Sequence, residues 1–291
     1  MNESIAAHDV KSTTPAMRLM LITAALLVLF QGLPIFLFPH DTATIFSWTV
    51  NPPITVAFLG AAYLSSMFME FLAAREANWS DARIAVPAVM VFTTLTTIVT
   101  LRHIDKFHFG SDHDTYTQVV TWAWLVVYLV VPPLLAVVWW KQVAAPGGDA
   151  RRGPAIAGPL RAVLAAQGLV VTVTGLALFI APEDVAPEVW PWKLSALTGG
   201  AIGAWLLGIG VGIWHAVWEN DLRRVRPGMI AFWVFAALQV VGLIRLSGNE
   251  TAEGASVLDW SGARIWMYVV VIVSILASSS YSLSQTPRRE S

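Results

Sequence analysis

The chain has 291 residues, of which 56% are hydrophobic and 13% are charged, and its mean hydropathy is +0.63. Because an average soluble domain carries about 25% charged residues, this composition indicates an integral membrane protein. The formal net charge of -1 provides no basic excess, which argues against nucleic-acid binding. Cysteine is absent, which excludes disulfides, thiolate metal sites, Fe–S clusters and cysteine nucleophiles.

The N-terminal segment 1–16 is polar and contains Glu3 and Asp9, whereas a secretory signal begins with basic residues followed by a short apolar core. We therefore expect no cleavable signal and a cytoplasmic tail before the first span. Apolar segments long enough to cross a bilayer recur along the chain, each bounded by charges, Pro or Trp. An all-α integral membrane fold is predicted, with eight transmembrane helices at about 17–38, 53–74, 84–101, 117–140, 160–181, 195–218, 227–246 and 262–283.

The distribution of Lys and Arg among the loops predicts the orientation. All but five of the 18 lie in the N-terminal tail, the second, fourth and sixth loops and the C-terminal tail. The positive-inside rule then puts both termini in the cytoplasm. The five predicted on the outer side are Arg102, Lys106, Lys193, Arg245 and Arg264.

Trp occurs 14 times, and many of these residues lie near the predicted span ends. Trp in that position typically anchors a helix at the membrane interface, because its ring is apolar and its N–H is polar. We therefore interpret them as interface anchors. Those predicted on the outer side are Trp48, Trp122, Trp190, Trp192 and Trp260.

An internal repeat is found when the chain is compared with itself at a shift of 143 positions, without gaps from Arg18 to Arg102, after which the register loosens. We predict two tandem four-helix units, 17–140 and 160–283, joined by the Gly/Pro/Arg-rich cytoplasmic linker 141–159 and followed by the tail 284–291. Since four is an even number, both units enter the membrane from the same side and the repeat is parallel. The matched pairs include Arg18 with Arg161, Gly32 with Gly175, Phe36 with Phe179, Asp41 with Asp184, Gly60 with Gly203, Glu76 with Glu219, Arg83 with Arg226 and Arg102 with Arg245.

Each predicted unit has an Asp just after its first span and an Arg at the outer end of its third, namely Asp41 and Arg102, then Asp184 and Arg245. A carboxylate and a guanidinium at the interface can pair bidentately. Each pair could therefore stabilise its own unit, or the arginines could line an outward-facing site for an anion or a lipid headgroup.

Within the predicted spans, polar residues are mostly uncharged, and Glu70 is the nearest approach to a buried carboxylate. It lies about one turn from the cytoplasmic end of the second span, where it could snorkel to the interface or pair with Arg75. An ionisable residue inside a membrane span is also a candidate functional residue.

The outer loop LRHIDKFHFGSDHD is rich in imidazole and carboxylate groups, which are ligands for Zn²⁺ and other divalent cations. The spacing of five between successive His residues matches neither a helical i, i+4 pair nor a known ligand signature. The loop is therefore either a divalent-metal site, confined to the first unit, or a solvated loop. Its candidate ligands are His103, Asp105, His108, Asp112, His113 and Asp114.

The sixth span has two GxxxG spacings, formed by Gly199, Gly203, Gly208 and Gly212. Small residues at this spacing allow a neighbouring helix to approach closely. We expect this face to pack against the other unit, or to join a homo-oligomer or a membrane complex.

The run LRHIDKFHFGS, the following WAWLVVYLVVPPLLAVVWW, and WENDLRRVRPGMIAF resemble sequences of a group of uncharacterised bacterial multi-pass membrane proteins. This resemblance implies a bacterial plasma (inner) membrane and no activity, cofactor or site residue. Nucleophile-elbow, Walker A, dinucleotide and HExxH motifs are absent from the sequence.

Our first hypothesis is a non-enzymatic transport or permeation component or an accessory subunit, with the bilayer as its surroundings. The second is a membrane-embedded metal-dependent factor or enzyme that uses the outer His/Asp loop.

Overall fold

The structure is a computed structural model, and it describes residues 10–248 and 256–286. Residues 1–9 and 287–291 of the predicted tails lie outside the described residues. Within the described ranges the secondary structure is helical, apart from isolated β-bridges of Val10 with Gly148 and Ser12 with Asn78. The helices are α2 (Pro15–Leu37), α3 (Thr42–Ile45), α4 (Pro53–Arg75), α5 (Trp79–Ala82), α6 (Ala85–Arg102), η1 (Ile104–Lys106), α7 (Thr115–Ala144), α8 (Gly158–Ile180), α9 (Pro182–Val189), α10 (Ala196–Glu219), α11 (Arg226–Leu246) and α12 (Ala263–Gln285).

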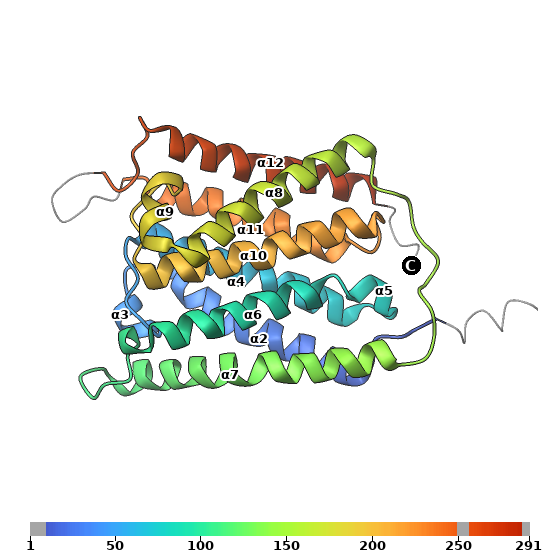
Figure 1. Cartoon of the computed structure of the whole chain (residues 1–291), viewed down its shortest axis with the longest axis horizontal. Helices are drawn as coiled ribbons and strands as arrows, with labels where there is room; N and C mark the ends of the chain where they lie inside the picture. Colours follow the sequence, from blue (N-terminus) through green and yellow to red (C-terminus); the bar gives the residue numbers. More distant parts are fainter. Residues whose placement is uncertain (1–9, 249–255, 287–291) are drawn as a thin grey trace, which may run out of the picture.

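Eight of the described helices are long and apolar enough to cross a membrane, which confirms the predicted all-helical multi-pass membrane protein. They are α2, α4, α6, α7, α8, α10, α11 and α12, and every end but one lies within two residues of its predicted position. Figure 1 shows them running side by side, with α2 beginning and α12 ending at the same end of the bundle. We call this the terminal end, and we call the opposite end, which carries α3 and α9, the α9 end.

Helix α7 extends four residues beyond its predicted end at residue 140. Gln142, in the last turn, is fully buried and holds the N-terminal segment. Its amide nitrogen donates to the Ser12 carbonyl at 2.9 Å, and its amide oxygen accepts from the Thr14 N–H at 2.8 Å. Because these contacts stabilise the last turn, the helix continues past the apolar stretch that the hydropathy pattern detects.

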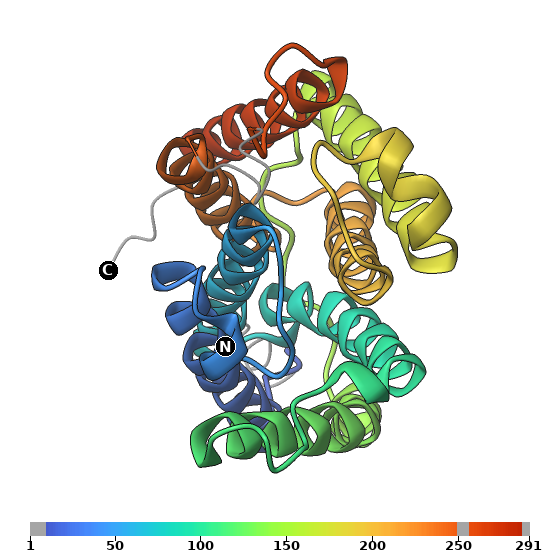
Figure 2. The same ribbon diagram turned by 90° about the vertical axis from the view of Figure 1, so that its left-hand side faces the viewer.

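Helices α4 and α10 lie at the centre of the bundle (Figures 1 and 2). In each of them 78% of the most apolar 18 residues are buried, against 22% in α7. Helix α2 packs along α4, and α8 packs along α10. The first half, α2 to α7, contacts the second half, α8 to α12, chiefly through α4 against α11 and α10 against α6.

Two close helix pairs depend on glycine. A Cβ atom added to Gly60 would lie 2.8 Å from the Cβ of Phe36, and one added to Gly203 would lie 2.6 Å from the backbone nitrogen of Phe179. Since real Cβ contacts are longer, α2 and α8 can approach α4 and α10 this closely only where the side chain is missing.

The glycines of the sixth span are all used inside the chain. A Cβ at Gly199 would lie 2.8 Å from the Cβ of Pro182, and one at Gly208 would lie 2.9 Å from the Cβ of Phe92 in α6. Gly212 faces α6 and α11 at ordinary van der Waals distance. The close packing of this span therefore occurs within the second half and between the halves, and it buries Gly199, Gly203, Gly208 and Gly212.

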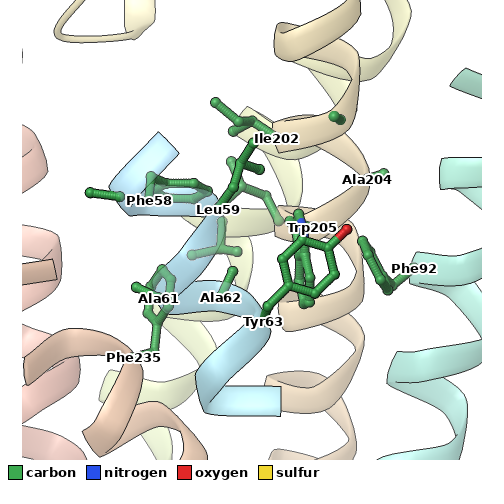
Figure 3. Packing of buried hydrophobic residues seen from close by; sticks show 14 of the residues in the cluster. Phe58, Leu59, Ala61, Ala62, Tyr63, Phe92, Ile202, Ala204, Trp205 and Phe235 are labelled. Carbon is green, nitrogen blue, oxygen red and sulfur yellow. The ribbon is translucent and has the colours of Figure 1, made fainter. Parts of the chain in front are cut away.

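Aromatic side chains fill the seam between the halves (Figure 3). Trp205 of α10 stacks on Phe92 of α6 with ring centroids 3.7 Å apart, and it meets Tyr63 of α4 edge-on at 4.9 Å. Phe58 of α4 and Phe235 of α11 form a further edge contact at 5.7 Å. A cavity beside these rings measures about 40 Å³, close to the ~30 Å³ that one water occupies in the liquid. Large apolar rings therefore occupy the seam that a polar pathway between the halves would need.

At the terminal end, a buried ion network joins both halves and the linker. The Glu219 carboxylate accepts from Arg83 of the first half at 2.7 and 2.9 Å, and from Arg224 at 2.6 Å. Both arginines also bond to Asp149 of the linker, at 2.8 and 3.0 Å. Because the Glu219 and Arg224 side chains are each only 1% exposed, these two charges depend on their partners.

Candidate functional site

The structure does not form the predicted pairs Asp41–Arg102 and Asp184–Arg245 within the described residues. Arg245 instead donates to the Phe36 carbonyl at 2.9 Å and lies over the Phe36 ring, 5.5 Å from its centroid. Arg102 lies over the Phe179 ring at 5.4 Å. Each arginine thus contacts the first helix of the other half, a cation–π arrangement that stabilises the contact between halves.

Glu70 is buried in the bundle rather than snorkelling to the interface, since it is only 1% exposed. Ser66, one turn before it in α4, donates to one carboxyl oxygen at 3.0 Å, and the other oxygen has no hydrogen-bond partner in the described part of the chain. Arg75 is exposed and lies over the Phe71 ring, so the expected pair with Glu70 is not formed. Glu70 is therefore a buried carboxyl group with a hydroxyl as its neighbour.

Two imidazoles of the predicted metal loop, those of His108 and His113, pack locally, and His103 lines the cleft described below. The Nδ1 of His108 lies 3.0 Å from the Phe46 carbonyl, and its Nε2 lies 3.1 Å from the Thr49 hydroxyl. The His113 ring lies against the His108 ring at a tilt of 33°, with centroids 4.1 Å apart. Burial of the His108 ring lowers the pKa of that imidazole and favours its neutral form.

The carboxylates of the same loop have local partners too. Asp114 caps α7 by accepting from the Thr117 N–H at 2.9 Å, and this hydrogen bond lowers the pKa of the Asp114 carboxyl. Asp105 pairs with Lys106 at 2.9 Å, which lowers the pKa of the Asp105 carboxyl. Within residues 10–248 and 256–286, no three His, Asp or Glu side chains are arranged as they would be to hold a metal ion.

A cleft of about 1000 Å³ opens at the α9 end, and residues from both halves line it. Its walls come from the segment before α4, the segment after α6, the α9–α10 region and the first turn of α12. This cleft, which we call the head cleft, is lined among others by Trp48, His103, Lys106, Glu183, Trp190, Trp192, Lys193, Ser195 and Arg264.

Trp48 forms the first-half wall of the head cleft, and aromatic packing holds it in place. Its ring lies 4.4 Å from Phe46 and 5.1 Å from Trp124, measured between centroids, and it is 3% exposed. Its indole N–H donates to the Thr198 hydroxyl of α10 at 3.4 Å. This contact joins the two halves directly beneath the cleft.

Trp190 and Trp192 line the second-half side of the head cleft, and both pack against Tyr268 of α12. The two indoles meet edge-on at 5.4 Å, and their rings lie 5.8 and 5.3 Å from Tyr268. Each Trp is 5% exposed, yet neither indole N–H has a hydrogen-bond partner within the described residues. Buried N–H groups are nearly always bonded, so these two unpaired donors in residues that line the cleft are exceptions, although both nitrogens are themselves enclosed.

The electrostatics of the head cleft favour an anion. Of the five basic residues predicted on the outer side, Lys106, Lys193 and Arg264 line this cleft, and Glu183 is the acidic residue among its lining. Helix α10 begins at the cleft with Ser195 as its N-cap, and α12 begins there as well. Helix N-termini carry partial positive charge and present free N–H groups, which adds to the attraction for anionic oxygens.

An apolar cavity of about 560 Å³ adjoins the head cleft and shares Trp190, Pro191 and Arg264 with it. We call this cavity the tail groove. It follows α12 from Ala263 to Ile275, and α8 forms its other side, with apolar side chains over most of its surface. The structure therefore joins a polar, cationic compartment to an apolar one through a shared aromatic wall.

A comparison of the chain with protein-family models, with curated proteins and with solved structures found no match. The candidate site therefore depends on geometry alone. Sequence reasoning identified the three cations and the tryptophans separately, as outer-side charges and interface anchors. The signal it missed is the run of Trp190, Pro191, Trp192 and Lys193 directly after the short helix α9, which concentrates aromatic and basic groups in one connection.

Proposed function

We propose that this chain is a non-enzymatic multi-pass membrane protein that binds an amphiphile with an anionic head group. The head group would occupy the head cleft and its apolar chain the tail groove. The observation that carries this proposal is the continuity of the two compartments through Trp190, Pro191 and Arg264. One ligand with a charged end and an apolar end satisfies both compartments together.

The dimensions of the tail groove support a lipid-like chain. From Ala263 to Ile275 the groove follows twelve residue steps of α12, which correspond to about 18 Å at 1.5 Å per residue. One leaflet contributes about 15 Å of hydrocarbon, half of the roughly 30 Å core. A single acyl or isoprenoid chain from one leaflet would therefore fill the groove.

The free indole donors support an anionic head group. Phosphate and carboxylate oxygens accept hydrogen bonds and neutralise nearby Lys and Arg, so one group would satisfy Trp190, Trp192 and the three cations together. Because Lys106 is already paired with Asp105 and Glu183 is the acidic residue in the lining, the three cations leave a small positive excess that a neutral head group would not balance.

The seam between the halves favours an accessory or ligand-presenting role over permeation. Trp205, Phe92 and Tyr63 occupy the place where a pathway between the halves would run. A protein that holds an amphiphile at one face of the membrane needs no such pathway. We therefore favour an accessory component that retains or delivers the amphiphile, with transport through the seam as the less supported alternative.

We further propose that the two halves arose by duplication and that the head cleft faces outward from a bacterial plasma membrane. The matched glycine contacts support the duplication, since Gly60 with Phe36 and Gly203 with Phe179 are related by the shift of 143 positions. The loop charges support cytoplasmic termini through the positive-inside rule. In that orientation the head cleft receives ligands from the outer leaflet.

Native mass spectrometry of the purified protein in mild detergent tests the binding proposal. Phosphatidylglycerol and phosphatidylcholine with identical chains are titrated against the wild type and a triple variant carrying Lys106→Gln, Lys193→Gln and Arg264→Gln. We expect preferential phosphatidylglycerol binding, and an affinity lower by about tenfold or more in the triple variant, because each charged hydrogen bond contributes. Trp192→Phe, which keeps the ring and removes the N–H, should weaken the same binding by a smaller factor.

A charge-matched control separates the cleft from general attraction. Arg75→Gln, Lys141→Gln and Arg151→Gln together remove three exposed cations from the terminal end and should leave binding unchanged. Equal losses in both triple variants, or equal binding of the two lipids by the wild type, would show that the head cleft has no selective role.

A further inference from the structure

A second groove, of about 310 Å³, lies between α2 and α7 of the first half. It occupies the same place in its half as the tail groove does in the second half, between the first and fourth spanning helices. Val28 in this groove matches Val171 in the tail groove at the shift of 143 positions. We call it the α2–α7 groove, and it takes no part in the amphiphile binding proposed above.

Polar groups distinguish the α2–α7 groove from the tail groove. At the shift of 143 positions, Gln31 stands where the tail groove has Thr174, and Tyr63 stands where it has Leu206. Tyr128 of α7 adds another hydroxyl to the lining. Yet none of the side chains that line the groove is charged, so it lacks what an anionic head group requires.

Gln31 is the polar group that requires an explanation. It lies six residues before the end of α2 at Leu37, which is about 9 Å below the α9 end at 1.5 Å per residue. Its side-chain amide makes no hydrogen bond within the described part of the chain. A free amide at membrane depth is costly, because the hydrocarbon has no polar groups with which to bond it.

Tyr63 and Tyr128, which both line the groove, form a buried hydroxyl pair. The hydroxyls of Tyr63 and Tyr128 lie 2.9 Å apart and hydrogen-bond to each other, and both residues are buried against the groove. The pair has two protons, of which the shared bond uses one, so the second hydroxyl can still donate. The walls of the groove also carry the flat rings of Phe30 and Trp124.

We propose that the α2–α7 groove binds a neutral, membrane-soluble quinone. Its planar ring would pack against Phe30 and Trp124, and its carbonyl oxygens would accept from the Gln31 amide and the Tyr63–Tyr128 pair. A quinone has carbonyl acceptors, no charge and an apolar tail, and these are the features that this lining complements. The groove opens between α2 and α7, whose facing residues include the exposed side chains Leu27 and Phe30, so the ligand would enter from the bilayer.

Decylubiquinone is the probe for this proposal, titrated into the purified protein in detergent and followed by isothermal titration calorimetry. Gln31→Leu should raise the dissociation constant about fivefold to tenfold, because it removes one hydrogen bond to the ligand. Thr174→Val, the change at the matched position in the tail groove, should leave it unchanged. Infrared spectra of the bound quinone give a second measurement, since a hydrogen-bonded carbonyl stretch should shift back upward in Gln31→Leu.

Three results would overturn the quinone proposal. They are the absence of saturable decylubiquinone binding, equal effects of Gln31→Leu and Thr174→Val, and a carbonyl stretch that Gln31→Leu does not move. Tyr128→Phe is a second, independent variant in case Gln31→Leu does not fold. It removes a hydroxyl on a different helix, and it should also weaken decylubiquinone binding. None of these measurements changes Lys106, Lys193 or Arg264 of the head cleft. A negative result for decylubiquinone would therefore not bear on the phosphatidylglycerol experiment.

Discussion

Two glycine-to-alanine substitutions in the same helix should differ in their effect on stability, one destabilising the protein and the other not. Both Gly203 and Gly212 are buried in α10, and both substitutions bring the same gain in helix propensity, about 1 kcal/mol on the peptide scale. At Gly203 the new Cβ would meet the backbone of Phe179 at 2.6 Å, with the Gly175 carbonyl oxygen at 2.8 Å. At Gly212 the nearest atoms, at 3.7 Å, belong to side chains in ordinary contact.

The size of each stability change depends on whether the atoms that face the new methyl group can move. Because the atoms that face Gly203 are backbone, α8 would have to move away from α10, and such overpacking costs typically 1–3 kcal/mol. We expect Gly203→Ala to lower the free energy of unfolding by up to roughly 2 kcal/mol once the propensity gain of about 1 kcal/mol is subtracted. Gly212→Ala should leave that free energy unchanged or raise it by up to about 1 kcal/mol, from propensity and the added methyl.

Unfolding by sodium dodecyl sulfate in mixed micelles, followed by far-UV circular dichroism, measures this difference. Gly158→Ala serves as a control, because nothing lies within 4 Å of a Cβ at that position. Loss of the same stability in Gly203→Ala and Gly212→Ala would refute the reasoning, since it would show that the α8–α10 distance does not decide the outcome.

Two further predictions concern charges at opposite ends of the bundle. Glu219→Gln should destabilise the protein by about 3 kcal/mol, near the lower end of the range for breaking a buried ion pair, because Asp149 still bonds to the Arg224 left behind. The same unfolding assay measures this loss. If the double variant Glu219→Leu with Arg224→Met were no more stable than Glu219→Gln, this account would be contradicted. Burial holds the pKa of His108 below its ordinary value of 6.5, so the unfolded chain takes up that proton first and stability should be lost as the pH falls below about 6.5. The unfolding midpoint in sodium dodecyl sulfate should differ between pH 7.5 and pH 5.5, and His108→Asn should reduce that difference. An unchanged difference would exclude His108 as its source.

Local hydrophobic content predicted most of the transmembrane architecture. The eight spans were expected within two residues of their observed ends, except for α7, because spanning a bilayer requires a property of contiguous residues. The end of α7 could not be predicted in this way, since the buried Gln142 is held by the N-terminal segment 130 positions away in the chain. Helix α9 escaped notice because its eight residues are too few and too polar to form a span.

The candidate sites depended on contacts between distant segments, which spacing along the chain does not reveal. The paired arginines Arg102 and Arg245 were expected to meet an Asp in their own half, yet each contacts a ring in the other half. Likewise, the hydropathy pattern left Glu70 free to snorkel, whereas the packing around α4 buries it.

By itself, the sequence determined that the chain is helical, that eight of its described helices are long and apolar enough to cross a membrane, and where close helix contact is possible through glycine. Those properties follow from hydrophobicity and side-chain size, which each residue carries wherever the chain folds. Only the tertiary structure decided that Lys106, Lys193 and Arg264 surround one cleft, and that Trp190 and Trp192 have free donors beside it. A cleft is formed by the mutual placement of helices, and that placement depends on side-chain packing over the whole bundle.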